Sequence, residues 1–190
     1  MQMKAAVMRV QGKPRPYADS HPMTIETVDL DPPGPGAVDL NADKLRLARE
    51  LGATDTFLAG NADVVAEIRS ATDGGLDYVI ETAGAIPAMN LAYAIAARGG
   101  MIVSAGLPAV SATFAFPHSA LVIDEKTIRG SYMGSCVPKR AIPRFIALYQ
   151  RGRLPVQKLR SGFVTFDQIN EGFDRLADGA VLRQVLRPHA

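Results

Sequence analysis

Asp39 is a carboxylate that directly follows the short apolar stretch Ala37-Val38. At the carboxyl end of a strand in a parallel sheet, such a carboxylate can accept hydrogen bonds from both hydroxyls of an adenosine ribose. The position also fits a purely structural interpretation, in which Asp39 and Asn41 together begin the following helix. Spacing alone favours the structural interpretation, so Asp39 by itself does not establish a nucleotide site.

The turn that would bind a pyrophosphate upstream of Asp39 is incomplete. It would be a Gly-x-Gly-x-x-Gly turn between a strand and a helix, about twenty residues earlier. Gly34-Pro35-Gly36 matches the first two glycines, but Asp39 occupies the place of the third and no helix follows directly. The backbone amides and helix N-terminus that hold a diphosphate are therefore not predicted here.

Metal-binding side chains are few and dispersed. The chain holds one cysteine, Cys136, and three histidines, His21, His118 and His189. No cluster of these residues has the spacing of a tetrahedral zinc site, and one cysteine excludes an internal disulfide. His118 is expected to begin a helix. The sequence thus predicts no bound zinc, and the cysteine usage favours a reducing compartment.

Length and composition exclude several classes of protein. Of the 190 residues, 47% are hydrophobic, which excludes a disordered chain and favours one domain with an appendage. The formal charge is +2 without a run of Lys or Arg, so no nucleic acid partner is expected. No apolar run approaches the length of a membrane span, and the first residues are too brief for a signal peptide. We therefore expect a cytoplasmic protein without a membrane partner.

Prolines cluster between residues 10 and 36, and the rest of the chain alternates apolar strands with periodic helices. Strands are expected at Lys4–Val10, Thr24–Leu30, Ala37–Leu40, Thr54–Leu58, Leu76–Thr82, Met101–Ala105, Ser111–Phe116, Thr127–Met133, Gly162–Phe166 and Val181–Leu186. Helices are expected between Asn41 and Gly52, and near Ala62–Thr72, Pro87–Ala97, Lys139–Gly152 and Asp167–Ala177. This alternation predicts an α/β fold with a mostly parallel sheet covered by helices.

Several strings resemble the zinc-type medium-chain alcohol dehydrogenases. They are Val38-Asp39-Leu40-Asn41-Ala42-Asp43-Lys44-Leu45, Ala48-Arg49-Glu50-Leu51-Gly52-Ala53-Thr54, Tyr78-Val79-Ile80-Glu81-Thr82-Ala83-Gly84, Ile102-Val103-Ser104-Ala105-Gly106-Leu107-Pro108, Ile128-Arg129-Gly130-Ser131-Tyr132-Met133-Gly134, Ile169-Asn170-Glu171-Gly172-Phe173 and Leu182-Arg183-Gln184-Val185-Leu186. Two further strings, Met3-Lys4-Ala5-Ala6-Val7 and Asp29 to Gly36, look like the opening of that family's catalytic domain.

The resemblance implies an internally shortened family member. Residues 1–36 would be a small β remnant of the catalytic domain, and residues 37–190 an incomplete doubly wound, Rossmann-like parallel sheet. Most of the catalytic domain and the first strand-turn-helix of the nucleotide-binding domain would be missing near the junction Gly36-Ala37. No residue matches the family's zinc ligands, so no catalytic residue is assigned.

The resemblance also implies a partial NAD site. Asp39 would hold the adenosine ribose, and its charge favours NAD over NADP because a 2′-phosphate would be repelled. The other implied cofactor residues are Lys44 beside the ribose, Thr82 and Ala83 along the cleft, Gly106 at a close approach and Arg183 at the pyrophosphate. Each of these five also has an ordinary interpretation as a solvated, capping or turn residue.

By resemblance the chain is an NAD-dependent alcohol dehydrogenase, an oxidoreductase, from which we do not expect independent turnover. One alternative is a catalytically silent remnant that keeps a nucleotide half-site or a dimer-forming surface, with Ser111–Phe116 as the homodimer segment. A degenerate reading frame is another. The sequence does not name a substrate.

A missing central strand would leave a gap between Ala37–Leu40 and Leu76–Thr82. Buried backbone groups along the gap would cost about 1–3 kcal/mol each without partners. We therefore expect the two flanking strands to pair directly. The alternative is that Lys4–Val10 or Thr24–Leu30 inserts between them.

Overall fold

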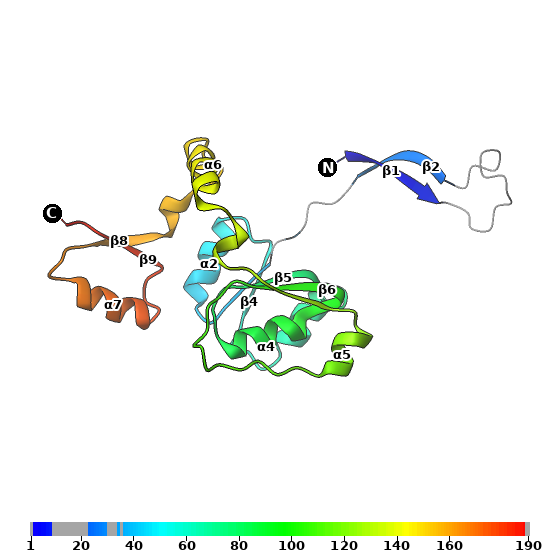
Figure 1. Ribbon diagram of the computed structural model, residues 1–190, viewed down its shortest axis with the longest axis horizontal. Coiled ribbons are helices and arrows are strands. Elements are labelled where there is room, and N and C mark those ends of the chain that lie inside the picture. The colour runs from blue at the N-terminus through cyan, green and yellow to red at the C-terminus, as the bar shows by residue number, and fades with distance from the viewer. Residues whose placement is uncertain (1, 9–22, 30–33, 35, 189–190) are drawn as a thin grey trace. The chain divides into compact units, whose positions relative to one another are not determined.

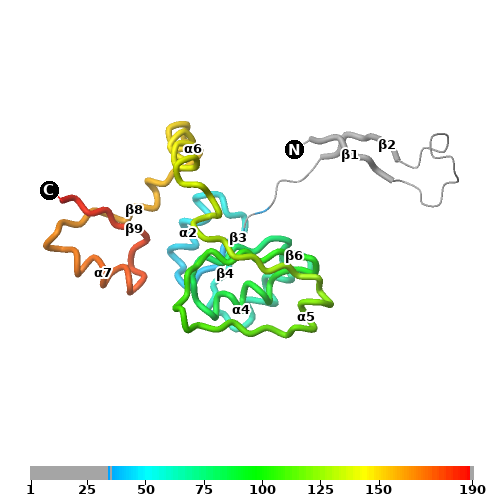
Figure 2. The backbone as a smooth tube through the Cα atoms, in the orientation of Figure 1, coloured from blue at the N-terminus to red at the C-terminus, as the bar shows by residue number. Residues whose placement is uncertain are grey.

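The computed structural model describes residues 2–8, 23–29, 34 and 36–188. The chain divides into two units, Met1–Arg129 and Gly130–Ala190, and each is described by itself. Figure 1 labels most of the helices and strands of both units, and Figure 2 traces the backbone as a tube. The division predicted at residue 36 stays a prediction.

The first unit has the expected alternation of strands and helices. Its strands are β1 (Gln2–Met8), β2 (Met23–Asp29), β3 (Gly36–Asp39), β4 (Asp55–Leu58), β5 (Leu76–Glu81), β6 (Ala96–Ser104) and β7 (Thr127–Gly130). Its helices are α2 (Ala42–Glu50), α3 (Val64–Ala71), α4 (Ile86–Ile95) and α5 (His118–Ile123). The α/β fold class with parallel strands is confirmed, and His118 begins a helix as predicted.

The parallel strands of this unit form two separate groups. β3 pairs with β4 in parallel, and β5 pairs with β6 in parallel within the order β5-β6-β7. β1 and β2 form an antiparallel pair in which Gln2 lies opposite Asp29. The sheet is thus interrupted between β3 and β5, where a doubly wound order would place one more strand.

Both predicted ways of closing the gap are wrong within the described residues. Val38 of β3 pairs with Phe57 of β4. Among the described pairings, β3 has no ladder to Val79 of β5, and none to β1 or β2. The physical reason is a shared core of side chains. Val38 and Phe57 pack against the cluster that contains Ile68 and Val79, so buried side chains join the two groups of strands without a ladder.

The core lies where α3 and α4 cover the strands. Ile68 of α3 and Ile102 of β6 are its largest fully buried side chains. The other buried members of this cluster are Val64, Val79, Met89, Ala92, Tyr93, Ile95 and Ala96. On the opposite face of β5, Tyr78 and Ile80 are 74% and 68% exposed. The described residues therefore cover only one face of this strand.

Residues 111–116 correct the sequence prediction, because they form turn and irregular backbone rather than a strand. The aromatic rings of this segment explain its conformation. Phe114 and Phe116 lie 6.1 and 5.7 Å from the ring of Tyr93, centroid to centroid. The segment thus packs on α4 through its aromatic side chains, and dimerisation through it stays a prediction.

The second unit is small. Its elements are a 3₁₀ turn η1 (Met133–Ser135), α6 (Pro138–Gln150), a 3₁₀ turn η2 (Val156–Leu159), β8 (Arg160–Val164), α7 (Ile169–Ala177) and β9 (Arg183–Leu186). β8 and β9 pair in parallel, and the amide of Gln184 donates a hydrogen bond of 2.7 Å to the carbonyl of Gly172 in α7. The closing helix and strand predicted from the sequence are confirmed.

Candidate active site

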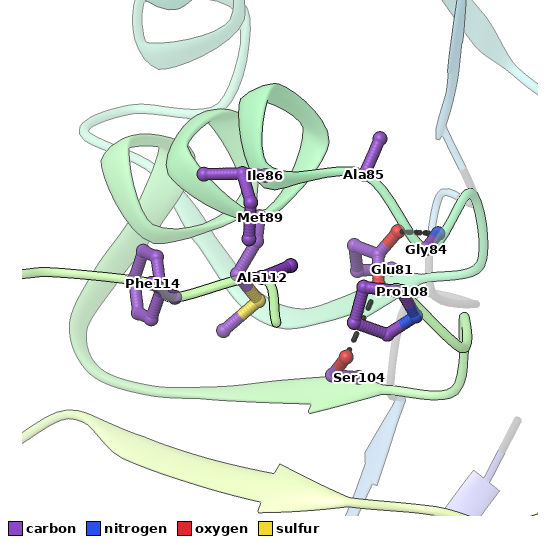
Figure 3. A pocket seen from close by; sticks show the side chains of 9 residues that line it. All are labelled: Glu81, Gly84, Ala85, Ile86, Met89, Ser104, Pro108, Ala112 and Phe114. Atoms are coloured by element: carbon purple, nitrogen blue, oxygen red, sulfur yellow. Dashed lines mark hydrogen bonds between the residues drawn. The ribbon is translucent and has the colours of Figure 1, made fainter. Parts of the chain in front are cut away.

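Glu81, the last residue of β5, is a buried carboxylate at the carboxyl end of a parallel strand. Its side chain is 5% exposed. One carboxylate oxygen accepts a hydrogen bond of 2.7 Å from the backbone N–H of Gly84, and the other accepts one of 3.1 Å from the hydroxyl of Ser104. Figure 3 shows these two bonds. The carboxylate therefore connects the turn after β5 to the end of β6.

The backbone of Glu81 reinforces this connection. Its carbonyl accepts hydrogen bonds from the N–H groups of Ala105 and Gly106, at 2.8 and 3.1 Å. A side chain at Gly106 would have its Cβ 2.1 Å from the nitrogen of Gly84, so only glycine fits there. The turn after β5 and the turn after β6 thus touch through their backbones, and Glu81 lies at the centre of their hydrogen bonds.

A cavity of about 150 Å³ opens beside this carboxylate. Its walls are mostly apolar, with Met89 of α4 and Phe114 among them (Figure 3). The full lining consists of Glu81, Gly84, Ala85, Ile86, Met89, Ser104, Pro108, Ala112 and Phe114. Open α/β sheets bind ligands beyond the carboxyl ends of their strands, and this cavity lies at that end of β5 and β6.

Asp39 ends β3 as predicted, and its carboxylate is held in place. Its Oδ1 accepts a hydrogen bond of 2.8 Å from the backbone N–H of Asn41, and its carbonyl accepts one from Ala59 at 2.9 Å. Asn41 is the N-cap of α2, where its side chain accepts bonds from Asp43 and Lys44 at 2.8 and 3.3 Å. Asp39 is half-buried, so its position serves the helix start and still leaves the carboxylate accessible.

Four of the other implied cofactor residues lie on α2 or on the turns after β5 and β6. Lys44 lies in the first turn of α2, half-buried. Thr82 and Ala83 follow β5 and are exposed, and Gly106 lies against the turn that contains them. Thr82, Ala83 and Gly106 are therefore brought together, whereas the role of each toward a cofactor stays a prediction.

Arg183 lies in the second unit, as the first residue of β9. Its guanidinium donates a hydrogen bond of 2.6 Å to the carbonyl of the neighbouring residue Leu182. The side chain is exposed. The structure thus shows a local backbone contact for Arg183, and its predicted contact with a pyrophosphate stays a prediction.

Sequence reasoning missed Glu81 and Ser104 as members of this site. Glu81 was visible only as part of the string Tyr78-Val79-Ile80-Glu81, where a charged residue ends an otherwise apolar strand. A charged residue at the end of an apolar strand is a signal of a functional or structural site, because a carboxylate is seldom fully buried unless it has hydrogen-bond or charge partners. Its partners are a backbone amide and a serine on the next strand, and neither is recognisable before the strands are paired.

The described residues do not fit a zinc ion. Within residues 2–8, 23–29, 34 and 36–188, no three His, Cys, Asp or Glu side chains are grouped to hold a metal. Cys136 lies after η1, where its Sγ donates a hydrogen bond to the carbonyl of Met133 at 3.0 Å. We therefore assign no chemical step to zinc.

Tyr93 of α4 is a buried phenol near the cavity wall. Its ring packs with Phe114, and the ammonium of Lys126 lies 4.6 Å from the ring centroid. Lys126 also pairs with Asp124 at 3.3 Å. Burial raises the pKa of the Tyr93 phenol above its ordinary value, and the negative charge of Asp124 raises it further. The phenol is therefore neutral at physiological pH.

Comparison with protein families gives a match over more than half of the chain. The family described as zinc-binding dehydrogenase matches residues 36–151. This range begins with β3 and ends just after α6, so it includes Asp39, Glu81 and the cavity.

Curated relatives include alcohol dehydrogenase 1 of Zea mays, 32% identical over 153 residues, or 79% of this chain and 40% of the relative. Geraniol dehydrogenase of Castellaniella defragrans is 33% identical over 150 residues, or 78% of this chain and 40% of the relative. The chain thus spans about 40% of the length of these relatives.

Solved structures agree with this similarity. Benzyl alcohol dehydrogenase from Acinetobacter calcoaceticus superposes with a TM-score of 0.75 at 33% identity, covering 80% of this chain and 41% of that one. An alcohol dehydrogenase zinc-binding domain protein from Burkholderia ambifaria gives 0.74 at 35% identity, covering 81% and 42%. The fold and the sequence point to the same group of proteins.

Proposed function

The chain belongs to the zinc-binding dehydrogenase family, and we propose that it binds the adenosine half of NAD at the carboxyl end of β3. Its relatives of known activity are alcohol dehydrogenases, which are oxidoreductases. Because the chain spans about 40% of their length, nucleotide binding is the part of that activity that its own residues support.

The observation that carries this proposal is the geometry of Asp39. The N–H of Asn41 holds one carboxylate oxygen at 2.8 Å, and this bond orients the side chain before any ligand arrives. A carboxylate that is already oriented spends little entropy on binding the two hydroxyls of a ribose. The same negative charge disfavours a 2′-phosphate, so NAD is preferred over NADP.

The turns after β5 and β6, around Glu81, are the part of the chain that we expect to contact the nucleotide opposite Asp39. Thr82 and Ala83 are exposed on the turn between Glu81 and Gly84. The Glu81 carboxylate holds this turn, because it accepts hydrogen bonds from the backbone N–H of Gly84 and from the hydroxyl of Ser104 on β6. A rigid, exposed turn at the carboxyl end of a parallel strand is the usual position for contacts with a nucleotide.

Binding should be weak, because the sequence carries no complete glycine-rich turn for the diphosphate. Hydrogen bonds to charged groups contribute about 1.5–3 kcal/mol each. Loss of the amides that would hold the diphosphate therefore costs several of these bonds. We expect a Kd for NAD weaker than micromolar, and we assign no independent alcohol oxidation to the chain.

Calorimetric titration of the full chain with NAD and with NADP tests the proposal. Asp39→Asn keeps an oxygen that accepts the bond from Asn41 but removes the charge, so NAD affinity should fall at least tenfold while folding is retained. Asp43→Asn is the matched control, because Asp43 is exposed on α2 and pairs only with Arg46 at 2.8 Å in the described part of the chain. Equal NAD affinity for both variants would refute the assignment of Asp39, and a micromolar Kd would contradict the weak mode of binding.

A further inference from the structure

The buried carboxylate of Glu81 has no cationic partner within the described part of the chain. None of the ion pairs found there includes it. The two groups that bond to it, the N–H of Gly84 and the hydroxyl of Ser104, are both neutral. α4 begins nearby at Ile86, and a helix N-terminus carries a partial positive charge of only about half a unit. Since buried charges are as a rule paired, Glu81 still lacks a full counter-charge.

The cavity beside Glu81 has room for such a counter-charge. Its nine lining residues all belong to the first unit, so the cavity is a feature of that unit alone. Glu81 and Ser104 carry the polar side chains of the lining, and they come from the adjacent strands β5 and β6. A group bound in the cavity can therefore reach the carboxylate from the side that Gly84 and Ser104 leave open.

Both polar side chains of the lining can only accept further hydrogen bonds. An ionised carboxylate has no hydrogen to donate. The hydroxyl of Ser104 donates its one hydrogen to Glu81, so its oxygen is left with acceptor capacity alone. The N–H of Gly84 is likewise already used on Glu81. A ligand that fits these side chains must therefore supply the donors, and a positively charged donor makes the stronger bond to a carboxylate.

The other walls of the cavity favour a small hydrocarbon body. In Figure 3 the side chains of Ile86, Met89 and Phe114 lie on the side of the cavity away from the two hydrogen bonds of Glu81. Met89 is buried, and the ring of Phe114 packs against Tyr93. The cavity volume is about 150 Å³, and an engineered apolar cavity of about this volume in another protein binds benzene. The space therefore suits a body of about six carbon atoms.

We propose that this cavity binds a small primary amine in its ammonium form. The ammonium group would donate to Glu81 and Ser104, and a body of about six carbon atoms would lie against Met89 and Phe114. An alkylamine is protonated at neutral pH, as the side chain of Lys is. Such a ligand supplies the counter-charge of Glu81 and covers the apolar walls at the same time. This proposal does not depend on nucleotide binding at Asp39.

A metal ion fits the cavity less well than an amine. The described residues group no three His, Cys, Asp or Glu side chains, and Glu81 is the one carboxylate in the cavity lining. Hard cations such as Ca²⁺ take six or more oxygen ligands. A bare cation would also leave Met89 and Phe114 without an apolar contact. The combination of one carboxylate with apolar walls therefore favours an organic cation.

Methyl NMR of methionine in the full chain gives a signal from inside the cavity. The chain has seven methionines, and among the described residues Met89 is the one in the cavity lining. Met89→Leu, which nearly conserves volume, identifies its signal by the loss of one peak. Cyclohexylamine, added at neutral pH without nucleotide, should shift the Met89 signal with a saturating dependence on concentration. The signal of Met101 should not move, because successive side chains of a strand point to opposite faces and Met101 is on the face of β6 opposite Ser104.

Two further probes separate the contributions of charge and hydrocarbon body on the wild-type protein. Cyclohexanol has the same ring without a charge, and methylamine has the charge without the ring. Each should bind at least about tenfold more weakly than cyclohexylamine, because one lacks the charge-assisted bond and the other lacks the apolar contact.

Glu81→Gln tests the carboxylate itself. Its amide oxygen can still accept from Gly84 and its amide nitrogen can donate to Ser104, whose hydroxyl rotates, so the turn keeps its bonds while the charge is lost. Affinity for cyclohexylamine should fall at least about tenfold. Glu50→Gln makes the same exchange at an exposed glutamate and should bind cyclohexylamine as the wild type does. Circular dichroism checks that both variants are folded.

Several results would overturn the proposal. They are a Met89 signal that does not saturate, a uniform shift of all methionine signals, equal affinity for cyclohexanol and cyclohexylamine, and unchanged affinity in folded Glu81→Gln. If that variant does not fold, the three probes on the wild-type protein decide. Loss of NAD binding with retained amine binding would contradict the proposed function and leave this inference standing.

Discussion

The carboxylate of Glu81 lies 2.7 Å from the backbone nitrogen of Gly84 and joins the turn after β5 to the strand beside it. The second carboxylate oxygen reaches Ser104 at 3.1 Å, and the carbonyl of the same residue accepts two further bonds from the turn after β6. A buried carboxylate with charge-assisted bonds is costly to disturb, because its loss leaves its donors unpaired. Glu81 is therefore a positioning residue for the turn that carries Thr82 and Ala83.

Replacement of Glu81 tests this relationship. Glu81→Ala removes both side-chain bonds and should lower the free energy of unfolding by about 3 kcal/mol or more, since bonds to charged groups contribute about 1.5–3 kcal/mol each. Ser104→Ala removes one bond and should cost about half as much. Urea denaturation followed by circular dichroism measures both values. Glu50→Ala, at an exposed end of α2, is the control and should change stability by less than about 0.5 kcal/mol. A loss for Glu81→Ala no larger than that of the control would contradict the assigned role.

Gly106 is the position where a methyl group should be least tolerated. Its Cβ would lie 2.1 Å from the nitrogen of Gly84, and backbone atoms cannot move aside as the end of a flexible side chain can. Overpacking of this kind costs about 1–3 kcal/mol, and occasionally more. Gly106→Ala should therefore lower the melting temperature by several degrees, whereas Gly60→Ala should not, because nothing lies within 4 Å of a Cβ at Gly60. Similar melting temperatures for the two variants would show that the turns separate easily.

Elemental analysis of the purified, tag-free protein tests the expectation that no zinc is bound. The sequence offers one cysteine and three histidines, and the described residues group no three metal-binding side chains. We expect zinc far below one equivalent per chain, unchanged after dialysis against a chelator. Near-stoichiometric zinc that the chelator removes would contradict this expectation.

The element types could be predicted from the sequence because their signals are local. Asn41 caps α2 as its residue type indicates, and the alternation from β3 to β7 follows the hydrophobic periodicity. For residues 111–116 the prediction from local signals was wrong. Their alternating apolar residues suggested a strand, whereas Phe114 and Phe116 pack as rings on Tyr93, a contact that only the folded chain provides.

The strand pairing and the candidate site were harder to predict because they depend on distant partners. The gap between β3 and β5 was expected to close through backbone pairing, but buried side chains of α3 and α4 hold the two groups of strands in one core. The burial of Glu81 depends on a hydrogen bond from Ser104, which lies 23 positions away in the sequence, so it could not be predicted before the strands were paired.

Tyr93 supplies a prediction for pH dependence. Burial raises the pKa of its phenol, and the charge of Asp124 adds to the effect. In the folded protein the phenol therefore keeps its proton at a pH where the unfolded chain, with an ordinary tyrosine pKa of about 10, has released it. The stability from this effect is fully present below pH ~10 and is lost as the pH rises through the raised pKa of the folded state, since the unfolded state binds fewer protons there.

Tyr93→Phe should remove the part of the stability loss at alkaline pH that comes from the raised pKa of Tyr93. Among the described residues the Tyr93 hydroxyl is buried without a hydrogen-bond partner, so its removal should also stabilise the protein at neutral pH by about 1 kcal/mol. Melting temperatures of wild type and Tyr93→Phe, measured in steps from pH 7 to strongly alkaline solution, should therefore diverge above pH ~10, with the variant falling less steeply. Tyr132→Phe is the matched control because Tyr132 is 75% exposed, and its curve should follow that of the wild type. Parallel curves for all three proteins would mean that the Tyr93 phenol ionises in the folded protein as it does in the unfolded chain.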